Sequence, residues 1–533
     1  MFGRVASRRC THVFGSSDFR LPSSSDRFSF HARIMPPAAS QEAATIAWPS
    51  NGARHFSSQH QPIPKKIAHK YMKELKQTRY WRDAIEIIDN VEKAGFVPNL
   101  FLFNAAINKC AYKGRWREAM RLYEQITKNR IQPDAFTFST LINTCGRGGR
   151  TDVALALWDE MPKQRVKPNE FVYASLISAC EKGGPKYVDA ALQYYADMSK
   201  SGLKPNLIAL SAAISACEKG GKRYTVMALR LLDEMKQHGL QPDVIVYSAA
   251  ISACEKGGTA KFTENALSLF QEMKQKQLKP NVYTYSALIS ACEKGGEEYT
   301  TRALDLYKEM KRERIEPTSV TFGSLISACE KGGETYTTQA FALFEEMKRR
   351  KIKAGVIEYT ALLSVSEKAR LPSKAFDLFC QMKTGGIKPD FAAYTSVIKS
   401  LFDANKYSDA KELTREAVTQ GVFQELQGNK WDLHGLSEAT ACMLLVHSLA
   451  KMENGSGLSD IIVVTGKGLN TEDPDGPVLR ERVPLFVKTI IGIPPTPVEG
   501  NEGRFIISKD DFEDWRETKM YQEFKGKFYL ANG

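Results

Sequence analysis

The 533-residue chain lacks any run of about 18 or more apolar residues, so we predict no transmembrane helix and no membrane partner. It also lacks a Cys-x-x-Cys pair and any Cys/His cluster at zinc spacing, which argues against a structural metal. A Walker A phosphate loop is missing too, because Ile461 stands where that motif needs glycine before Gly466-Lys467. These absences argue against integral membrane proteins, zinc modules and P-loop nucleotide hydrolases, and we expect no cofactor.

Acidic residues are outnumbered by basic ones. The formal net charge is +13 and the isoelectric point is about 9.1. Such a balance favours a polyanionic partner, either nucleic acid or an acidic membrane surface. Hydrophobic residues make up 43% of the chain, which is enough to bury a large core.

Residues 1–60 contain no lysine. They hold seven arginines, many serines and three acidic residues, Asp18, Asp26 and Glu42. An Arg-rich, Ser-rich, acid-poor leader is typical of a transit peptide. The Arg54–Ser58 segment resembles a mitochondrial processing site with cleavage after Phe56. We therefore expect a mitochondrial matrix protein, with a plastid address as the main alternative and an untargeted disordered tail as another.

An internal repeat organises residues 65–425. The phrase Ser-Ala-Cys-Glu-Lys-Gly-Gly occurs at 178–184, 215–221, 252–258, 290–296 and 327–333. Seven cysteines share its phase, at spacings of 35, 35, 37, 37, 38 and 37 residues. These cysteines are Cys110, Cys145, Cys180, Cys217, Cys254, Cys292 and Cys329. A proline, usually followed by Asp or Asn, closes nearly every unit, so the segment is an array of similar structural units.

Each unit predicts two helices. In unit 282–318, Tyr285, Leu288, Ile289 and Cys292 fall on one helical face, and Gly295-Gly296 ends that helix. The same spacing recurs at Ala303, Leu306, Tyr307 and Met310, which gives a second amphipathic helix. A single hairpin cannot bury these faces, but stacked neighbours can, so the pattern predicts a mainly α-helical solenoid. The cysteines then act as small buried hydrophobes.

The period of 35 residues with a closing Pro-Asp or Pro-Asn resembles the pentatricopeptide repeat family. The resemblance recurs about ten times and implies a right-handed superhelix. Tetratricopeptide repeats are the alternative, but their Trp-Leu-Gly-Tyr pattern is absent. Five central units, from 170 to 355, have two or three extra residues after the Gly-Gly pair. We expect these residues to lengthen only the turn between helices.

The resemblance implies binding of single-stranded RNA, one base per repeat, running 5′ to 3′. In the family, the fifth residue of the first helix and the last residue of the unit read a base edge. The pairs are Asn104 with Asp134, Ser139 with Asn169, Ala174 with Asn206, Ser211 with Asp243, Ser248 with Asn281, Ser286 with Thr318, Gly323 with Gly355, and Thr360 with Asp390. The family's pattern then implies the sequence UANGANNG. Ala174, Gly323 and Gly355 depart from the pattern. The alternative role of each polar residue is helix capping or solvation.

The second residue of most units is large and apolar. The family uses this residue to wedge between bases, and packing between hairpins is the alternative. The candidates are Phe101, Phe136, Phe171, Ile208, Ile245, Tyr283, Val320 and Ile357.

The end of each first helix carries a cation at one phase, which we call the basic ladder. Its members are Arg147, Lys182, Lys219, Lys256, Lys294, Lys331 and Lys368. Charges repeated on one edge favour contact with RNA phosphates. Stabilisation of the helix C-terminus by a cation is the alternative.

The pattern changes after about residue 425. Residues 430–509 predict a β-α-β-α-β order, with an amphipathic helix at 438–452 and a buried strand at 461–464. The segments Asp-Leu-His-Gly-Leu-Ser and Thr-Gly-Lys-Gly resemble the motifs of the small MutS-related (SMR) domain. We leave residues 510–533 as a polar C-terminal tail without a function.

Members of the SMR family bind nucleic acid, and some cut it. The resemblance implicates Asp432 and His434 as candidate catalytic residues. A Gly-rich turn can also form an anion site, here Thr465, Gly466, Lys467 and Gly468. A histidine beside a carboxylate can act as a general acid or base, and a divalent cation is conceivable if the domain is a nuclease. The alternative is a structural histidine, so cleavage and mere binding both stay open.

The sequence as a whole predicts an organellar RNA-binding protein that acts in RNA processing, stabilisation or translation. An SMR endoribonuclease guided by the repeats is the first alternative, and a protein-binding helical scaffold is the second. We expect a monomer whose partner is single-stranded RNA. Organellar ribosomes or RNA-processing proteins are further candidate partners.

Overall fold

A computed structural model describes residues 61–452, 459–466, 478–501 and 503–528 of the chain. The chain divides into two compact units, Met1–Gly257 and Gly258–Gly533. The predicted transit peptide lies outside the described residues. Within those residues no helix combines the length and the apolar character that a bilayer crossing requires.

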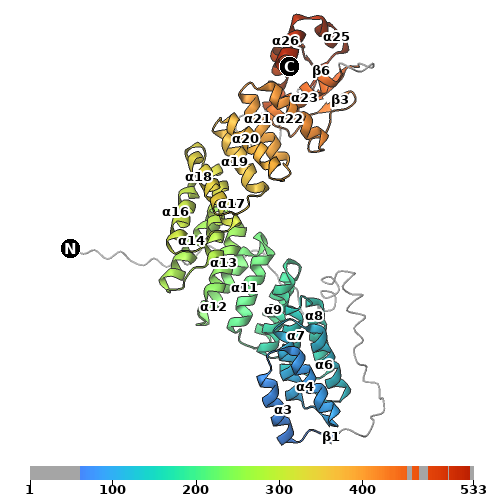
Figure 1. The fold of residues 1–533 in the computed structure, drawn as a ribbon, viewed down its shortest axis with the longest axis vertical. Coiled ribbons are helices and arrows are strands. Elements are labelled where there is room, and N and C mark those ends of the chain that lie inside the picture. The colour runs from blue at the N-terminus through green and yellow to red at the C-terminus, as the bar shows by residue number, and fades with distance from the viewer. Residues whose placement is uncertain (1–60, 453–458, 467–477, 502, 529–533) are drawn as a thin grey trace, which may run out of the picture. The chain divides into compact units, whose positions relative to one another are not determined.

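The first unit consists of antiparallel helix pairs that follow one another along the chain (Figure 1). A short parallel pairing of β1 (Gln61–Pro62) with β2 (Phe96–Val97) lies at its start. Its helices are α3 (Lys65–Gln77), α4 (Trp81–Lys93), α5 (Leu100–Ala111), α6 (Trp116–Lys128), α7 (Ala135–Arg147), α8 (Thr151–Lys163), α9 (Glu170–Gly183), α10 (Val188–Lys200), α11 (Leu207–Gly220), α12 (Thr225–Gln237) and α13 (Val244–Gly257).

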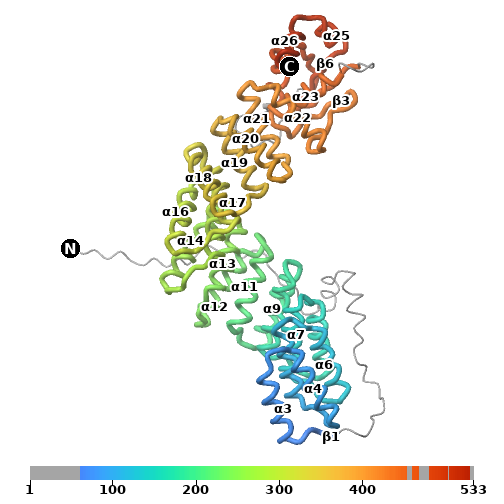
Figure 2. Tube along the Cα trace, viewed as in Figure 1, coloured from blue at the N-terminus to red at the C-terminus, as the bar shows by residue number. Residues whose placement is uncertain are grey.

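The second unit continues the helical pattern before a sheet begins, as the chain trace in Figure 2 shows. Its repeat helices are α14 (Ala260–Gln275), α15 (Val282–Gly295), α16 (Thr300–Arg312), α17 (Ser319–Lys331), α18 (Thr337–Arg349), α19 (Val356–Lys368), α20 (Pro372–Thr384), α21 (Phe391–Asp403) and α22 (Tyr407–Thr419). The predicted array of helical repeats is therefore confirmed.

The buried core of the array follows the predicted period. All seven phased cysteines are buried, and so are Leu288, Ile289, Leu306 and Met310 of the unit analysed above. First helices pack against the first helices of neighbouring repeats within each unit, and second helices cover them. Each cysteine thus fills space on the face where consecutive hairpins meet.

The two glycines of the repeated phrase have different roles. A Cβ atom at Gly220 would lie 2.3 Å from the Tyr224 ring, so only glycine fits there. Gly221 has φ +78°, a conformation that residues with a side chain rarely adopt. In four of the units the extra residues form a short 3₁₀ turn: η2 (Pro185–Tyr187), η3 (Lys222–Tyr224), η4 (Glu297–Tyr299) and η5 (Glu334–Tyr336).

The C-terminal part of the second unit holds a four-stranded sheet in the order β3-β4-β6-β5. β3 (Lys430–Asp432) pairs parallel with β4 (Ile461–Val464), which pairs antiparallel with β6 (Arg504–Ile507). The edge strand β5 (Thr496–Pro497), absent from the prediction, pairs antiparallel with β6. The helices here are α23 (Glu438–Met452) and α24 (Val478–Phe486), which runs into a π-helical turn, η6 (Val487–Ile491).

Helix α23 has the predicted bounds but not the predicted amphipathic character. Residues 439–446 are all buried, because the helix packs against α21, α22 and α24. The C-terminal part therefore rests on the last hairpin of the repeats, which covers the side of α23 that we expected to face solvent.

Residues 529–533 of the predicted polar tail lie outside the described residues. The rest of that tail is instead part of the core, which corrects the prediction. It forms α25 (Lys509–Glu517) and α26 (Lys519–Phe528), and Trp515, Phe524 and Phe528 are buried. The Phe528 ring lies 5.4 Å from that of Tyr407 in α22. Residues 509–528 thus attach the sheet to the repeat helices through aromatic contacts.

Candidate nucleic-acid interface

The last residue of nearly every repeat is the N-cap of the next helix. Asp134 Oδ1 accepts the Thr137 amide at 2.7 Å, and Asn281 Oδ1 accepts the Thr284 amide at 3.0 Å. The same bond is made by Asn99, Asn169, Asn206, Asp243, Thr318 and Asp390. The cap fixes the side chain's direction and leaves asparagine an amide donor but aspartate a second acceptor. Capping and base recognition are therefore compatible roles.

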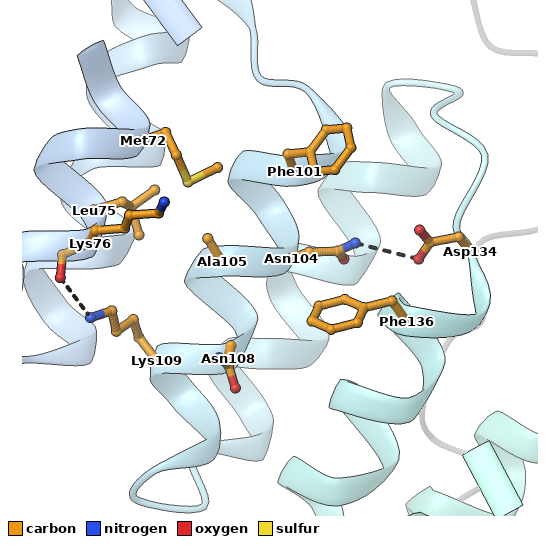
Figure 3. Close-up of a pocket in the computed structure, with 10 residues that line it drawn as sticks. All are labelled: Met72, Leu75, Lys76, Phe101, Asn104, Ala105, Asn108, Lys109, Asp134 and Phe136. Carbon is orange, nitrogen blue, oxygen red and sulfur yellow. Dashed lines mark hydrogen bonds between the residues drawn. The ribbon is translucent and has the colours of Figure 1, made fainter. Parts of the chain in front are cut away.

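The unit 100–134 shows one complete candidate site, a groove of about 620 Å³ (Figure 3). Asn104 Nδ2 donates to Asp134 Oδ1 at 3.4 Å, and the Thr137 hydroxyl lies 2.8 Å from Asn104 Oδ1. Phe101 and Phe136 lie on either side of this polar pair. The groove thus combines two apolar faces with donors and acceptors between them, which is the arrangement that a base requires.

Other predicted base-reading residues vary in their contacts. The Thr360 hydroxyl donates to Asp390 at 3.4 Å, so this pair also meets directly. The hydroxyls of Ser139 and Ser211 donate to carbonyls of their own helices, which leaves their oxygens as acceptors. Ser286 Oγ lies 2.9 Å from Oγ1 of Thr321, which is the third residue of the next unit. The predicted partner of Ser286 was instead Thr318.

The eight predicted stacking residues are all exposed, with fractions between 56% and 77%. An exposed large apolar residue at the same phase of eight repeats is not explained by packing between hairpins. The structure therefore leaves these side chains available, as base stacking would require.

Four lysines of the basic ladder contact the preceding repeat. Lys219 Nζ lies 2.5 Å from Glu181 Oε1 and donates to the Glu181 carbonyl at 3.1 Å. The same double contact joins Lys256 to Glu218, Lys331 to Glu293, and Lys368 to Glu330. Each lysine caps the preceding repeat's first helix while 34% to 45% of its side chain stays exposed.

The remaining ladder members lie in the last turns of α7, α9 and α15: Arg147, Lys182 and Lys294. Burial, together with the nearby Arg147, lowers the pKa of Lys182. The ladder thus joins neighbouring repeats within each unit, and its role in phosphate contact stays a prediction.

The two motifs of the C-terminal part lie together. His434 Nδ1 is 2.6 Å from Asp432 Oδ1. Burial acts to raise the pKa of Asp432, but hydrogen bonds from the ring and amide of His434 outweigh it and lower that pKa. A Cβ atom at Gly466 would lie 3.4 Å from His434 Cβ, so the second motif begins beside the pair. Thr465 is buried and anchored to the Gly503 carbonyl, whereas Lys467 and Gly468 lie outside the described residues.

The third residue of a unit also contributes to the site, although its role was not predicted from the sequence. Thr137 contacts Asn104 and Thr321 contacts Ser286, so this residue reaches back to the preceding unit's fifth residue. Thr137, Thr284 and Thr321 also complete capping boxes, and Glu358 accepts the amide of its N-cap residue, Gly355. Their spacing, three residues after the unit's last residue, was the available signal. Among the described residues no group of three or more His, Cys, Asp or Glu side chains could hold a metal ion.

Family models match most of the repeat region. A pentatricopeptide repeat domain model matches residues 195–257, 230–297, 268–332 and 342–404. A PPR repeat family model matches 98–147 and 140–182, and a single PPR repeat model matches 320–352. Together the matches cover residues 98–182 and 195–404, which is more than half of the chain. No curated protein matches the chain.

Solved structures that match the chain include the pentatricopeptide repeat protein PPR10 from maize, at 19% identity and a TM-score of 0.42. That match covers 87% of this chain and 64% of the maize chain, so this chain spans less than two thirds of that protein. PPR10 in complex with an 18-nt psaJ RNA element matches at 22% identity and a TM-score of 0.32, covering 73% and 58%. The PPR domain of Arabidopsis thaliana protein-only RNase P 1 in complex with tRNA matches at 18% identity and a TM-score of 0.30. That match covers 32% of this chain and 86% of the Arabidopsis chain.

Proposed function

Because this chain belongs to the pentatricopeptide repeat family, we propose that it binds single-stranded RNA selectively, with consecutive repeats contacting consecutive bases. The observation that carries the proposal is the groove of unit 100–134, where Asn104 and Asp134 lie between Phe101 and Phe136. The exposed apolar residue recurs through eight repeats, so the same stacking surface is available along the array.

Single-stranded RNA fits this surface better than a duplex does. Stacking on Phe101 and Phe136 requires unstacked bases, and the polar groups between them can meet only a free Watson–Crick edge. A protein-binding scaffold would also cap its helices, but it would not need an exposed apolar residue at the same phase of eight repeats. RNA recognition therefore accounts for more of the recurring features than a scaffold does.

The test exchanges one base-reading residue without changing its capping role. Asp243→Asn converts the pair Ser211/Asp243, expected to select guanine, into the Ser/Asn type expected to select adenine. Asparagine and aspartate are equally good N-caps, so stability should change little. Titration of RNAs carrying 5′-UANGANNG-3′, with G or A at the fourth base, should show the preference reversed by about tenfold, or about 1.4 kcal/mol.

Two outcomes separate the alternatives. If Asp243→Asn still prefers guanine while binding RNA normally, the polar pairs are only caps and selectivity arises elsewhere. If the wild-type protein binds neither RNA at low salt, the scaffold hypothesis replaces RNA binding. Asp390→Asn, which acts on the eighth base, is the matched control because it should leave the fourth-base preference unchanged.

A second function, in the C-terminal part, is phosphodiester cleavage by an SMR-type domain. It is supported by the contact of His434 with Asp432 beside Gly466, where a histidine could move a proton at a phosphate bound by backbone amides. Metal-dependent cutting should be lost in His434→Ala while RNA affinity persists. Unchanged cutting in that variant would end the catalytic assignment and leave clamping as the role of this part.

We further propose the mitochondrial matrix as the location, with a plastid as the alternative, on the composition of residues 1–60. A fluorescent reporter fused to residues 1–64 should enter one of these organelles. A reporter that stays in the cytosol would refute both addresses.

A further inference from the structure

The unit 319–355 has glycine at both base-reading positions, Gly323 and Gly355, so no side chain of its own can read a base there. The space is nevertheless occupied by Glu358, the third residue of the next unit, at the start of α19. A Cβ atom at Gly323 would lie 2.8 Å from Glu358 Oε1, and one at Gly355 would lie 3.3 Å from Oε2. The carboxylate therefore lies where the two missing side chains would be.

Glu358 is held in place firmly. Only 7% of the residue is exposed, and Oε2 accepts the amide of the N-cap residue Gly355 at 2.7 Å. The N-terminus of α19 also favours a negative charge at this point. Within the part of the chain that the structure describes, Oε1 accepts no hydrogen bond, so an oriented acceptor is left over.

Similar contacts between the third residue of one unit and the fifth residue of the preceding unit occur elsewhere in the array. The third residues Thr137 and Thr321 reach back to Asn104 and Ser286, the fifth residues of the preceding units. In unit 100–134 a carboxylate, Asp134, stands beside the reading position as well. Glutamate is longer than threonine, so at the same position it can enter the reading site instead of supporting it.

We propose that Glu358 is the base-reading residue of unit 319–355 and that it selects guanine at the seventh base of the bound RNA. This proposal rests on the RNA-binding function proposed above. A carboxylate only accepts hydrogen bonds, and guanine offers two adjacent donors, N1–H and the N2 amino group, on its Watson–Crick edge. Adenine, cytosine and uracil each place an acceptor beside their single donor group, which would face the carboxylate unfavourably.

The test varies the seventh base of a 5′-UANGANNG-3′ RNA through G, A, C and U and measures affinity for the full-length protein. The wild-type protein should bind the guanine RNA about tenfold more tightly than the others. Glu358→Gln should remove that preference, because the glutamine oxygen stays on the Gly355 amide and the NH2 group then presents donors to the donors of guanine. Glutamine can still accept the Gly355 amide, so its melting temperature should stay close to that of the wild type.

The fourth base provides the internal control. If the wild-type protein shows no guanine preference at the seventh base, or if Glu358→Gln retains it, while Asp243 still sets the fourth base, the inference about Glu358 is wrong and RNA recognition stands. If neither base affects binding, the proposed function itself has failed. The preference of the wild-type protein at the seventh base is measured without any variant. The inference can therefore be refuted even if Glu358→Gln does not fold.

Discussion

The repeat array and the C-terminal part are stabilised in different ways. In the array the same contact recurs: the hydroxyl at the start of a second helix donates to an alanine carbonyl 28 residues later, as from Thr225 to Ala253 and from Thr300 to Ala328. In the C-terminal part the contacts occur once and join distant segments, as when Phe528 meets Tyr407. A role in the array can therefore be argued from recurrence, whereas a role for His434 depends on one geometry.

Alkaline pH should destabilise the repeat array more than the C-terminal part, where burial raises the pKa of one thiol, that of Cys442. Burial raises the pKa of the thiols of Cys145, Cys217 and Cys254 from 9.0 to about 12, and the other phased cysteines shift in the same direction. The folded array thus holds protons that the unfolded chain releases above pH 9, so stability present below pH 9 is lost as pH rises toward 12. Each thiol contributes about 1.4 kcal/mol per pH unit in that interval.

Urea unfolding at pH 8 and pH 10 would measure this loss, with Cys217→Ala as the variant. The variant should be less stable at pH 8 but should lose less stability between the two pH values. Cys380, which is exposed, is the matched control and should leave the pH dependence unchanged when replaced by alanine. Equal pH dependence in wild type and Cys217→Ala would show that the thiols do not cause the alkaline loss.

Replacing a phenylalanine by alanine should have different effects in the two regions. Phe528→Ala should lower stability, whereas Phe136→Ala should weaken RNA binding. Phe528 is 1% exposed within an aromatic cluster, so its loss should destabilise the C-terminal part by about 3–5 kcal/mol. Phe136 is 56% exposed, so its loss should hardly change stability but should weaken RNA binding by about 1–3 kcal/mol. Unfolding followed by tryptophan fluorescence is suitable, because Trp515 lies 5.0 Å from Phe524 in that cluster.

If Phe136→Ala destabilised the protein as much as Phe528→Ala, the exposed apolar residues would be packing residues after all. If Phe528→Ala were harmless, the aromatic contacts of residues 509–528 would not stabilise the C-terminal part. The same substitution, phenylalanine to alanine, therefore tests a buried residue of the C-terminal part and an exposed residue of the array.

The array was predictable because one pattern is repeated many times. Cys217, Ala216 and Leu232 each have equivalents in neighbouring repeats, so periodicity alone indicated the helices and their buried faces. The C-terminal helices were not predictable in this way. In the sequence, Trp515 and Phe524 lie among charged residues, which hides their burial. The aromatic cluster to which they belong also contains Tyr407, which is more than 100 residues away in the chain.

The base-reading sites were only partly predictable. Asn104 and Asp134 were identified and do meet, but Glu358 was missed because it belongs to the following unit. Its position follows from the geometry of a helix N-terminus, where the third residue turns back toward the cap. Sequence patterns assign residues to units, whereas the contact here crosses from one unit to the next.

The smallest expected effect concerns the ion pairs of the basic ladder. Lys256 pairs with Glu218 at 2.5 Å, and both side chains are partly exposed, at 34% and 21%. Glu218→Gln should therefore lower stability by no more than about 1 kcal/mol, because a partly solvated pair contributes little. It should also free the positive charge of Lys256, so RNA affinity should rise and its dependence on salt should become steeper.

A salt series from low to physiological concentration would measure that slope for wild type, Glu218→Gln and a control, Glu412→Gln. Glu412 pairs with Arg415 within one helix and does not belong to the ladder, so its replacement should leave the slope unchanged. A steeper slope for Glu218→Gln alone would assign the ladder to phosphate contact as well as to joining repeats. Identical slopes for all three proteins would restrict the ladder to holding one repeat against the next, and the region that binds the RNA backbone would then have to lie elsewhere on the array.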